Sequence, residues 1–170
     1  MASRSDGDLE VFRIASAAYP VFDGGGAARW GSRWCTPGRN IIHTASAYAL
    51  ALLENLVHWN TTALPRGMRY VVGTIPATVA RTVLDPASLP GWDRDDYAIS
   101  QRYGDAWYDA GEVAVLVVPS VLSPFEPNVL INQRHADSRI IRVAEEQPVS
   151  IDPRLSRGGR SQTPRRLTTG

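Results

Sequence analysis

Glu54 is the one carboxylate in the stretch 31–59, where it lies deep inside an apolar segment with the spacing of a helix. On a helix, the residues three and four positions away from it are mostly apolar. One interpretation is that Glu54, Asn55 and His58 form a solvated stripe near the helix end. The other is that Glu54 faces a pocket, where burial and a cationic partner set its ionisation. The helix alone leaves both interpretations open.

Arginines that could serve as that partner lie shortly upstream, in a glycine-rich segment at 22–40. They are Arg29, Arg33 and Arg39. Guanidinium groups bind phosphates or carboxylates through paired hydrogen bonds, and glycine lets the backbone approach an anion closely. An ordinary solvated loop is the alternative, although Trp30 and Trp34 favour a loop that packs or stacks.

The histidines and Ser120 lack the sequence motifs of a zinc site and of a serine hydrolase. His43, His58 and His135 lack partners at the spacing of a zinc site, so we expect no bound metal. Ser120 follows a strand-like apolar run, but no G-x-S-x-G motif surrounds it, which disfavours a serine hydrolase. The chain also lacks the G-x-x-x-x-G-K-[ST] phosphate loop.

Apolar patterns predict the elements that must position these residues. Strands are expected over 10–15, 40–45, 68–76, 113–119, 128–132 and 139–143, and helices over 47–58 and 97–110. The first strand carries Arg13. The helix that carries Glu54 is apolar all round in its first two turns, which is typical of a buried helix. Because strands and helices do not alternate regularly, we expect an α+β fold, a single compact domain with a mixed sheet.

Length and composition bound the organisation of the chain. Its 170 residues are 44% hydrophobic, enough for one domain, which we place at 11–155 after a flexible segment at 1–10. All 18 basic residues are arginines, against 17 acidic residues, and five of these arginines follow position 153. The body of the chain is therefore mildly acidic. We predict that 156–170 is a disordered, arginine-rich tail that catalysis does not need.

The cellular compartment also follows from composition. Cys35 is the single cysteine and cannot form an internal disulfide, and the first ten residues lack the apolar core of a secretory signal. The longest apolar runs are far shorter than the roughly 20 residues that cross a bilayer. We therefore expect a cytoplasmic protein that does not span a membrane.

Six segments in register carry a resemblance to a known family. They include "GGGAARWGSRW", "LLENLVHW", "YGDAWYDAG", "VLVVPSVLSPFEPNVLINQRHAD" and "IDPRL". Residues 11–155 resemble the RES-domain family, toxins of bacterial toxin–antitoxin pairs named for an arginine, a glutamate and a serine. By position these fall on Arg33, Glu54 and Ser120, and an earlier family arginine falls on Arg13. The chain departs from the pattern at His43, where the family usually has tyrosine.

The resemblance implies a fold and an activity. It implies a fold similar to ADP-ribosyltransferases and a type II toxin that cleaves NAD at the bond between nicotinamide and ribose. NAD would be the substrate, and no cofactor would be permanently bound. Some members resemble protein ADP-ribosyltransferases instead, so the acceptor stays open between water, phosphate and protein. An antitoxin with a helix-turn-helix DNA-binding region would block the active site, and a homodimer is expected within the complex.

The residues would then take different roles in breaking the bond to nicotinamide. Positive charge builds on the ribose, and Glu54 would oppose it. Arg33, with Arg13 near it, would bind the pyrophosphate. His43 would stack on or hydrogen-bond to the nicotinamide side, and its titration near pH 6.5 should appear in turnover. Ser120 would position the substrate or Glu54.

Two other classes remain as alternatives. In an RNA-cleaving toxin, His43 or His58 would act as acid or base and arginines would hold the backbone. The mildly acidic body argues against this class, and we expect no direct binding of nucleic acid outside the tail. A binding module without catalysis is the third class. Release of nicotinamide separates the first class from both others, and RNA degradation separates those two.

Overall fold

A mixed β-sheet runs through the computed structural model, which describes residues 7–58, 67–150 and 152. The strand order is β4, β5, β6, β2, β1, β3, β7, and β8 also pairs with β3. β4 and β5 are parallel, whereas the other pairs are antiparallel. The strands are β1 (Leu9–Ser16), β2 (Ile41–Ala45), β3 (Met68–Ile75), β4 (Arg81–Val83), β5 (Val115–Val118), β6 (Asn128–Asn132), β7 (Arg142–Val143) and β8 (Gln147–Pro148). The predicted α+β fold with a mixed sheet is confirmed.

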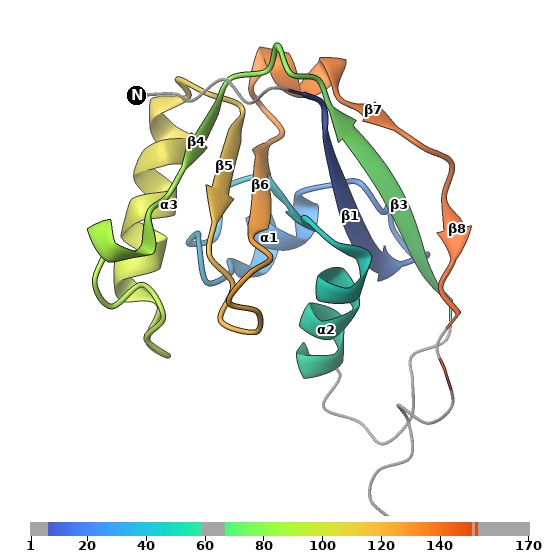
Figure 1. Cartoon of the computed structure of the whole chain (residues 1–170), viewed down its shortest axis with the longest axis horizontal. Helices are drawn as coiled ribbons and strands as arrows, with labels where there is room; N and C mark the ends of the chain where they lie inside the picture. Colours follow the sequence, from blue (N-terminus) through green and yellow to red (C-terminus); the bar gives the residue numbers. More distant parts are fainter. Residues whose placement is uncertain (1–6, 59–66, 151, 153–170) are drawn as a thin grey trace, which may run out of the picture.

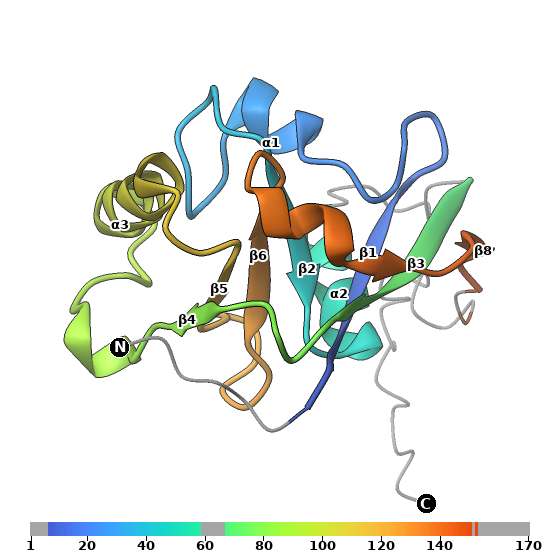
Figure 2. The same ribbon diagram turned by 90° about the horizontal axis from the view of Figure 1, so that it is seen from above.

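Helices pack beside one end of the sheet and against its central strands. In the described residues these are α1 (Gly25–Trp30), α2 (Tyr48–His58) and α3 (Ala98–Ala110), with 3-10 turns η1 (Pro86–Ser88) and η2 (Ala136–Ile140). Both Figure 1 and Figure 2 place α3 at the β4–β5 end of the sheet, and α2 against β1 and β2. Two parts of the chain that are distant in sequence thus stand beside the central strands.

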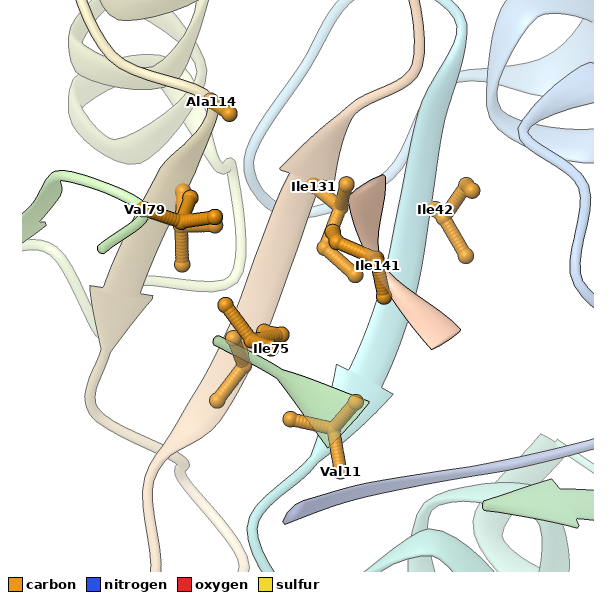
Figure 3. Packing of buried hydrophobic residues seen from close by; sticks show 9 residues of the cluster. Val11, Ile42, Ile75, Val79, Ala114, Ile131 and Ile141 are labelled. Carbon is orange, nitrogen blue, oxygen red and sulfur yellow. The ribbon is translucent and has the colours of Figure 1, made fainter. Parts of the chain in front are cut away.

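Side chains of the central strands pack on both faces of the sheet. On one face Ile131 packs with Ile75 and Ile141 (Figure 3). On the other face Leu116 and Leu130 pack in a cluster that includes residues of α1 and α3. Burial on both faces explains why these strands appear in the sequence as nearly continuous apolar runs.

The helix predicted over 47–58 is confirmed as α2, but its environment differs from the prediction. Leu50 and Ala51 are buried against Ile14 and Ala45 of the sheet. Leu53 and Val57 are 39% and 58% exposed. The helix therefore packs into the core through the face that carries Leu50 and Ala51, whereas the burial on all sides that its apolar first two turns indicated is absent, because nothing in the described residues covers its outer face.

The second predicted helix is α3, which packs unusually closely on the glycine-rich loop. A Cβ atom at Gly104 would lie 1.9 Å from the carbonyl oxygen of Trp34. Glycine at this position, a weak helix former in the sequence, is what allows the contact. Asp105 reinforces it by accepting hydrogen bonds from the backbone N–H and the hydroxyl of Thr36, at 3.0 and 2.7 Å.

Other differences lie in short elements. The strand predicted over 139–143 is formed only in part, as β7 at Arg142–Val143. Its first two residues belong to η2, because backbone hydrogen bonds from Ser138 to His135 and from Ile141 to Ser138 close tight turns there. α1, β4 and β8 were not predicted. The predicted tail at 156–170 lies outside the described residues. Within the described part, every helix is too short or too polar to cross a bilayer.

Candidate active site

A cavity of about 810 Å³ opens between α2, the central strands and the segment that leads into α3. Four of the five predicted site residues line it: Arg13 from β1, Arg33 from the glycine-rich loop, His43 from β2 and Glu54 from α2. The fifth, Ser120, is buried beside Glu54 and hydrogen-bonded to it. Side chains separated by up to 107 positions in the sequence therefore meet at one place.

Glu54 is held through one of its two carboxylate oxygens. Oε1 accepts a hydrogen bond from the Ser120 hydroxyl at 2.9 Å and another from Asn128 Nδ2 at 2.7 Å. The Ser120 oxygen itself accepts from the N–H of Leu122 at 3.0 Å, which turns the hydroxyl proton toward Glu54. Oε2 has no donor among the described residues. The carboxylate is thus fixed in orientation and keeps one oxygen for a ligand.

The sequence did not identify Asn128 as a residue of the site. It begins β6 and lines the cavity, but it stands in "NVLIN", a segment that predicts only a short strand. A polar side chain at the start of an apolar strand was the available signal. Many strand ends carry such a residue, so the signal did not distinguish Asn128.

Arg33 is held on one side of its guanidinium group. Nη1 donates to the carbonyl oxygens of Arg94, at 2.9 Å, and Trp92, at 3.4 Å. The Tyr97 ring lies against the group, with Cζ 4.3 Å from the ring centroid. Nε and Nη2 meet no acceptor among the described residues. That edge of guanidinium is one of the forks that bind carboxylate or phosphate in bidentate fashion.

Arg13 has a different environment from Arg33. Its Nη1 and Nη2 donate to the carbonyl oxygens of His43, at 2.7 Å, and Asp23, at 3.0 Å, and its Nε donates to that of Val21. Burial lowers the pKa of Arg13 to about 10, an effect that the nearby Asp23 carboxylate opposes. Every nitrogen of the guanidinium group therefore ties backbone segments together. The sequence did not predict these contacts.

His43 is enclosed in the cavity wall as a neutral imidazole. Burial lowers its pKa to about 3, and the positive charge of Arg13 acts in the same direction. Its Nε2 atom is buried and has no hydrogen-bond partner among the described residues. The predicted titration near pH 6.5 is therefore wrong, because an isolated histidine was assumed where the fold supplies burial and a neighbouring cation.

The other arginines of the loop lie outside the cavity lining. Arg39 binds Asp109 through Nε and Nη2, at 3.0 and 2.5 Å, and lies 3.2 Å from Asp105. Hydrogen bonding by Arg39 lowers the pKa of Asp109. Arg29 is exposed and lies over the Trp30 ring. Of the three loop arginines, Arg33 alone lines the cavity.

The arrangement combines an anionic and a cationic group that can each contact one ligand. A carboxylate with a free oxygen can accept hydrogen bonds from hydroxyls or oppose a developing positive charge. A guanidinium fork can bind an anionic part of the same molecule. In the described residues, no three His, Cys, Asp or Glu side chains come together as a metal-binding set.

Comparisons with known proteins give consistent results. Residues 10–152 match the family model described as RES domain. The chain is 38% identical over 154 residues to the Prs ADP-ribosylating toxin of Sphingobium sp. (strain YBL2). The matched region covers 86% of this chain and 96% of that protein. It is 31% identical over 138 residues to the Toxin Res of Pseudomonas putida (strain KT2440), covering 80% and 92%. The fold is similar to a chain of the M. tuberculosis MbcT–MbcA toxin–antitoxin complex, with a TM-score of 0.70 and 16% identity over 88% of this chain and 90% of that one.

Proposed function

The chain belongs to the RES domain family, and from this membership we propose that it is the toxin of a toxin–antitoxin pair that cleaves NAD between nicotinamide and ribose. One observation carries the proposal. Glu54 Oε2 and the Nε–Nη2 edge of Arg33 belong to side chains that line the same cavity, and neither has a partner among the described residues. NAD presents ribose hydroxyls and a pyrophosphate, which suit these two groups.

In the proposed reaction the bond between ribose C1 and the nicotinamide nitrogen breaks. Its electron pair leaves with nicotinamide, which becomes neutral, and positive charge spreads over the ribose carbon and ring oxygen. The Glu54 carboxylate opposes this charge in a partly buried cavity, where its electrostatic effect is stronger than in water. A nucleophile then adds to the ribose carbon and loses a proton.

The other residues orient the substrate or the catalytic carboxylate. Arg33 binds the pyrophosphate and fixes the distance from it to Glu54. Ser120 and Asn128 keep the carboxylate turned so that Oε2 remains available. Neutral His43, with its unpartnered Nε2, hydrogen-bonds to or packs against the nicotinamide side. Arg13 joins β1 to β2 in the cavity lining and contributes its charge rather than a phosphate contact.

The acceptor distinguishes two forms of the proposal. The relative named Prs ADP-ribosylating toxin supports transfer of ADP-ribose to an acceptor as in a protein ADP-ribosyltransferase, whereas water or phosphate as acceptor would deplete NAD. We propose cleavage of NAD as the shared first step. The RNA-cleaving alternative loses support at His43, because a pKa of about 3 leaves its imidazole unprotonated near pH 7 and unable to act as an acid.

A partner antitoxin is part of the proposal, since the similar fold was solved in a toxin–antitoxin complex. We propose that this antitoxin carries a helix-turn-helix region and binds a toxin homodimer in the cytoplasm. Co-purification of the two products, followed by size-exclusion chromatography with light scattering, measures the stoichiometry. A complex with one toxin chain would overturn the homodimer.

Release of nicotinamide from NAD by the purified chain, freed of antitoxin, tests the central step. Chromatography of the products identifies ADP-ribose or its phosphorylated form, and labelled NAD with cell lysate detects a modified protein. We expect nicotinamide together with one of these products. A folded chain that releases no nicotinamide and labels no protein overturns the proposal.

A further inference from the structure

Tyr97 adopts a backbone conformation that is costly for its side chain. Its φ angle is 56°, and it is the one residue other than glycine with positive φ in the described part of the chain. The left-handed region is unfavourable for side chains with a Cβ atom, and aromatic residues rarely adopt it. Such strain persists where surrounding contacts impose it and is concentrated at functional sites.

The position of Tyr97 connects α3 to the cavity. It immediately precedes Ala98, the first residue of α3, and its ring lies against the Arg33 guanidinium at 4.3 Å. From the first turn of α3, Gln101 donates to the carbonyl oxygen of Ser32 at 2.9 Å. Tyr97 and Gln101 both line the cavity. The start of α3 therefore contacts Arg33 and its neighbour Ser32 at the edge of the cavity.

The contacts of Arg33 show what this surface does. The two carbonyl oxygens that bind Nη1 belong to Trp92 and Arg94, in the segment that leads to Tyr97. The ring covers one face of the planar group, so rotation of the side chain would cost both contacts. Carbonyls and ring together hold one side of guanidinium and leave the Nε–Nη2 fork to a ligand.

We propose that Tyr97 is a positioning residue that holds the Arg33 fork for the diphosphate of the substrate. Its ring, placed by the left-handed backbone, fixes the guanidinium plane before the substrate arrives and so reduces the ordering cost of binding. The ligand class is a nucleoside diphosphate. The inference rests on the proposed NAD chemistry for its substrate but on the observed Arg33 contacts for its geometry.

The test compares variants that separate the ring from the backbone. Tyr97→Asn removes the ring, and asparagine tolerates the left-handed region better than most residues. Tyr97→Phe keeps the ring. Tyr19→Asn is the control, because Tyr19 is 74% exposed and does not line the cavity. Tyr97→Gly, which accommodates positive φ, serves as a second variant without a ring.

Kinetics with NAD and calorimetric binding of ADP give the readouts. We expect Tyr97→Asn to raise KM for NAD and Kd for ADP roughly tenfold each, with a much smaller change in kcat and in melting temperature. Tyr97→Phe and Tyr19→Asn should behave like the unmodified protein. A merely structural tyrosine would lower the melting temperature and leave KM and Kd of the folded fraction unchanged, which would overturn the proposal.

The two proposals fail separately. If the unmodified chain releases no nicotinamide but binds ADP more tightly than Tyr97→Asn, the NAD reaction is refuted and the role of Tyr97 stands. If the chain cleaves NAD and folded Tyr97→Asn and Tyr97→Gly match it in KM and Kd, the role of Tyr97 is refuted. Loss of folding in both variants would assign Tyr97 to stability and also refute the inference.

Discussion

Glu54 and Arg33 each use one part of the side chain for anchoring and keep the other part for a ligand. Glu54 is anchored through Oε1 by Ser120 and Asn128, and Arg33 through Nη1 by two backbone carbonyls. Arg13 and Arg39 have their nitrogens committed to carbonyl oxygens, to carboxylates or to a hydroxyl. These arginines all carry a positive charge. Arg33 differs from Arg13 and Arg39 because part of its guanidinium group has no partner among the described residues and can bind a ligand.

Glu54→Gln should lower kcat for NAD cleavage on the order of 10²-fold or more while KM changes little, because it removes the charge that opposes the ribose cation. Arg33→Ala should raise KM as well as lower kcat, since a phosphate contact acts in both the ground state and the transition state. Steady-state release of nicotinamide measures both. Glu112→Gln, at an exposed position outside the cavity lining, is the control. Full activity of Glu54→Gln would contradict the assignment.

The enclosed imidazole of His43 predicts a pH effect on stability rather than on turnover. Its pKa is lowered to about 3 in the folded chain and returns to about 6.5 on unfolding. Between these values the unfolded state binds a proton that the folded state does not. The free energy of unfolding should therefore fall as pH decreases from 6.5 toward 3, by up to about 1.4 kcal/mol per pH unit from this residue.

Urea unfolding at several pH values measures this contribution as a difference between proteins. His43→Gln should show a shallower loss of stability with acid than the unmodified chain. Equal slopes in the two proteins would show that His43 titrates alike in both states.

At the scale of elements, α3 and the glycine-rich loop are joined by close backbone packing and by hydrogen bonds between side chains and backbone. Gly104 allows their backbones to touch, and hydrogen bonds from Thr36 and Arg39 to Asp105 and Asp109 join them again. Because Arg33 belongs to the loop and its supporting ring to the start of α3, this junction sets the geometry of the anion-binding side of the cavity.

Gly104→Ala should therefore destabilise the chain by roughly 1–3 kcal/mol or more, since its Cβ atom would overlap the Trp34 carbonyl oxygen. Chemical denaturation measures the loss. Gly26→Ala is the matched control, because a Cβ atom in α1 meets nothing within 4 Å there, and it should be neutral or slightly stabilising. A Gly104→Ala protein as stable as Gly26→Ala would disprove the close contact.

The sequence predicted the elements better than the contacts between them. Apolar patterns located β1, β2, β3, β5, β6, α2 and α3, and the family resemblance placed Arg33, Glu54 and Ser120. Asn128 and Tyr97 were missed because their partners lie 74 and 64 positions away in the sequence. For the same reason Arg39 looked equivalent to Arg33, since the acids that bind it come from α3.

At the scale of the whole molecule, the arginine-rich tail at 156–170 lies outside the described residues, and its composition carries the prediction. We predict that deletion of 156–170 leaves turnover of NAD within a few-fold, because that segment offers little apolar surface to bury. Nicotinamide release by the shortened chain measures this. A folded deletion with abolished turnover would place the tail in the catalytic machinery.

The strand order also determines when the chain can become toxic during its synthesis. β2 pairs with β6, which is synthesised much later, and among the described residues the donors to the Glu54 carboxylate are Ser120 and Asn128. Ribosomes release the chain from its N-terminus onward. A nascent chain that already displays Arg13, Arg33 and Glu54 therefore has no complete site until β6 has emerged, and we expect products that end before Asn128 to lack the oriented carboxylate and with it the activity.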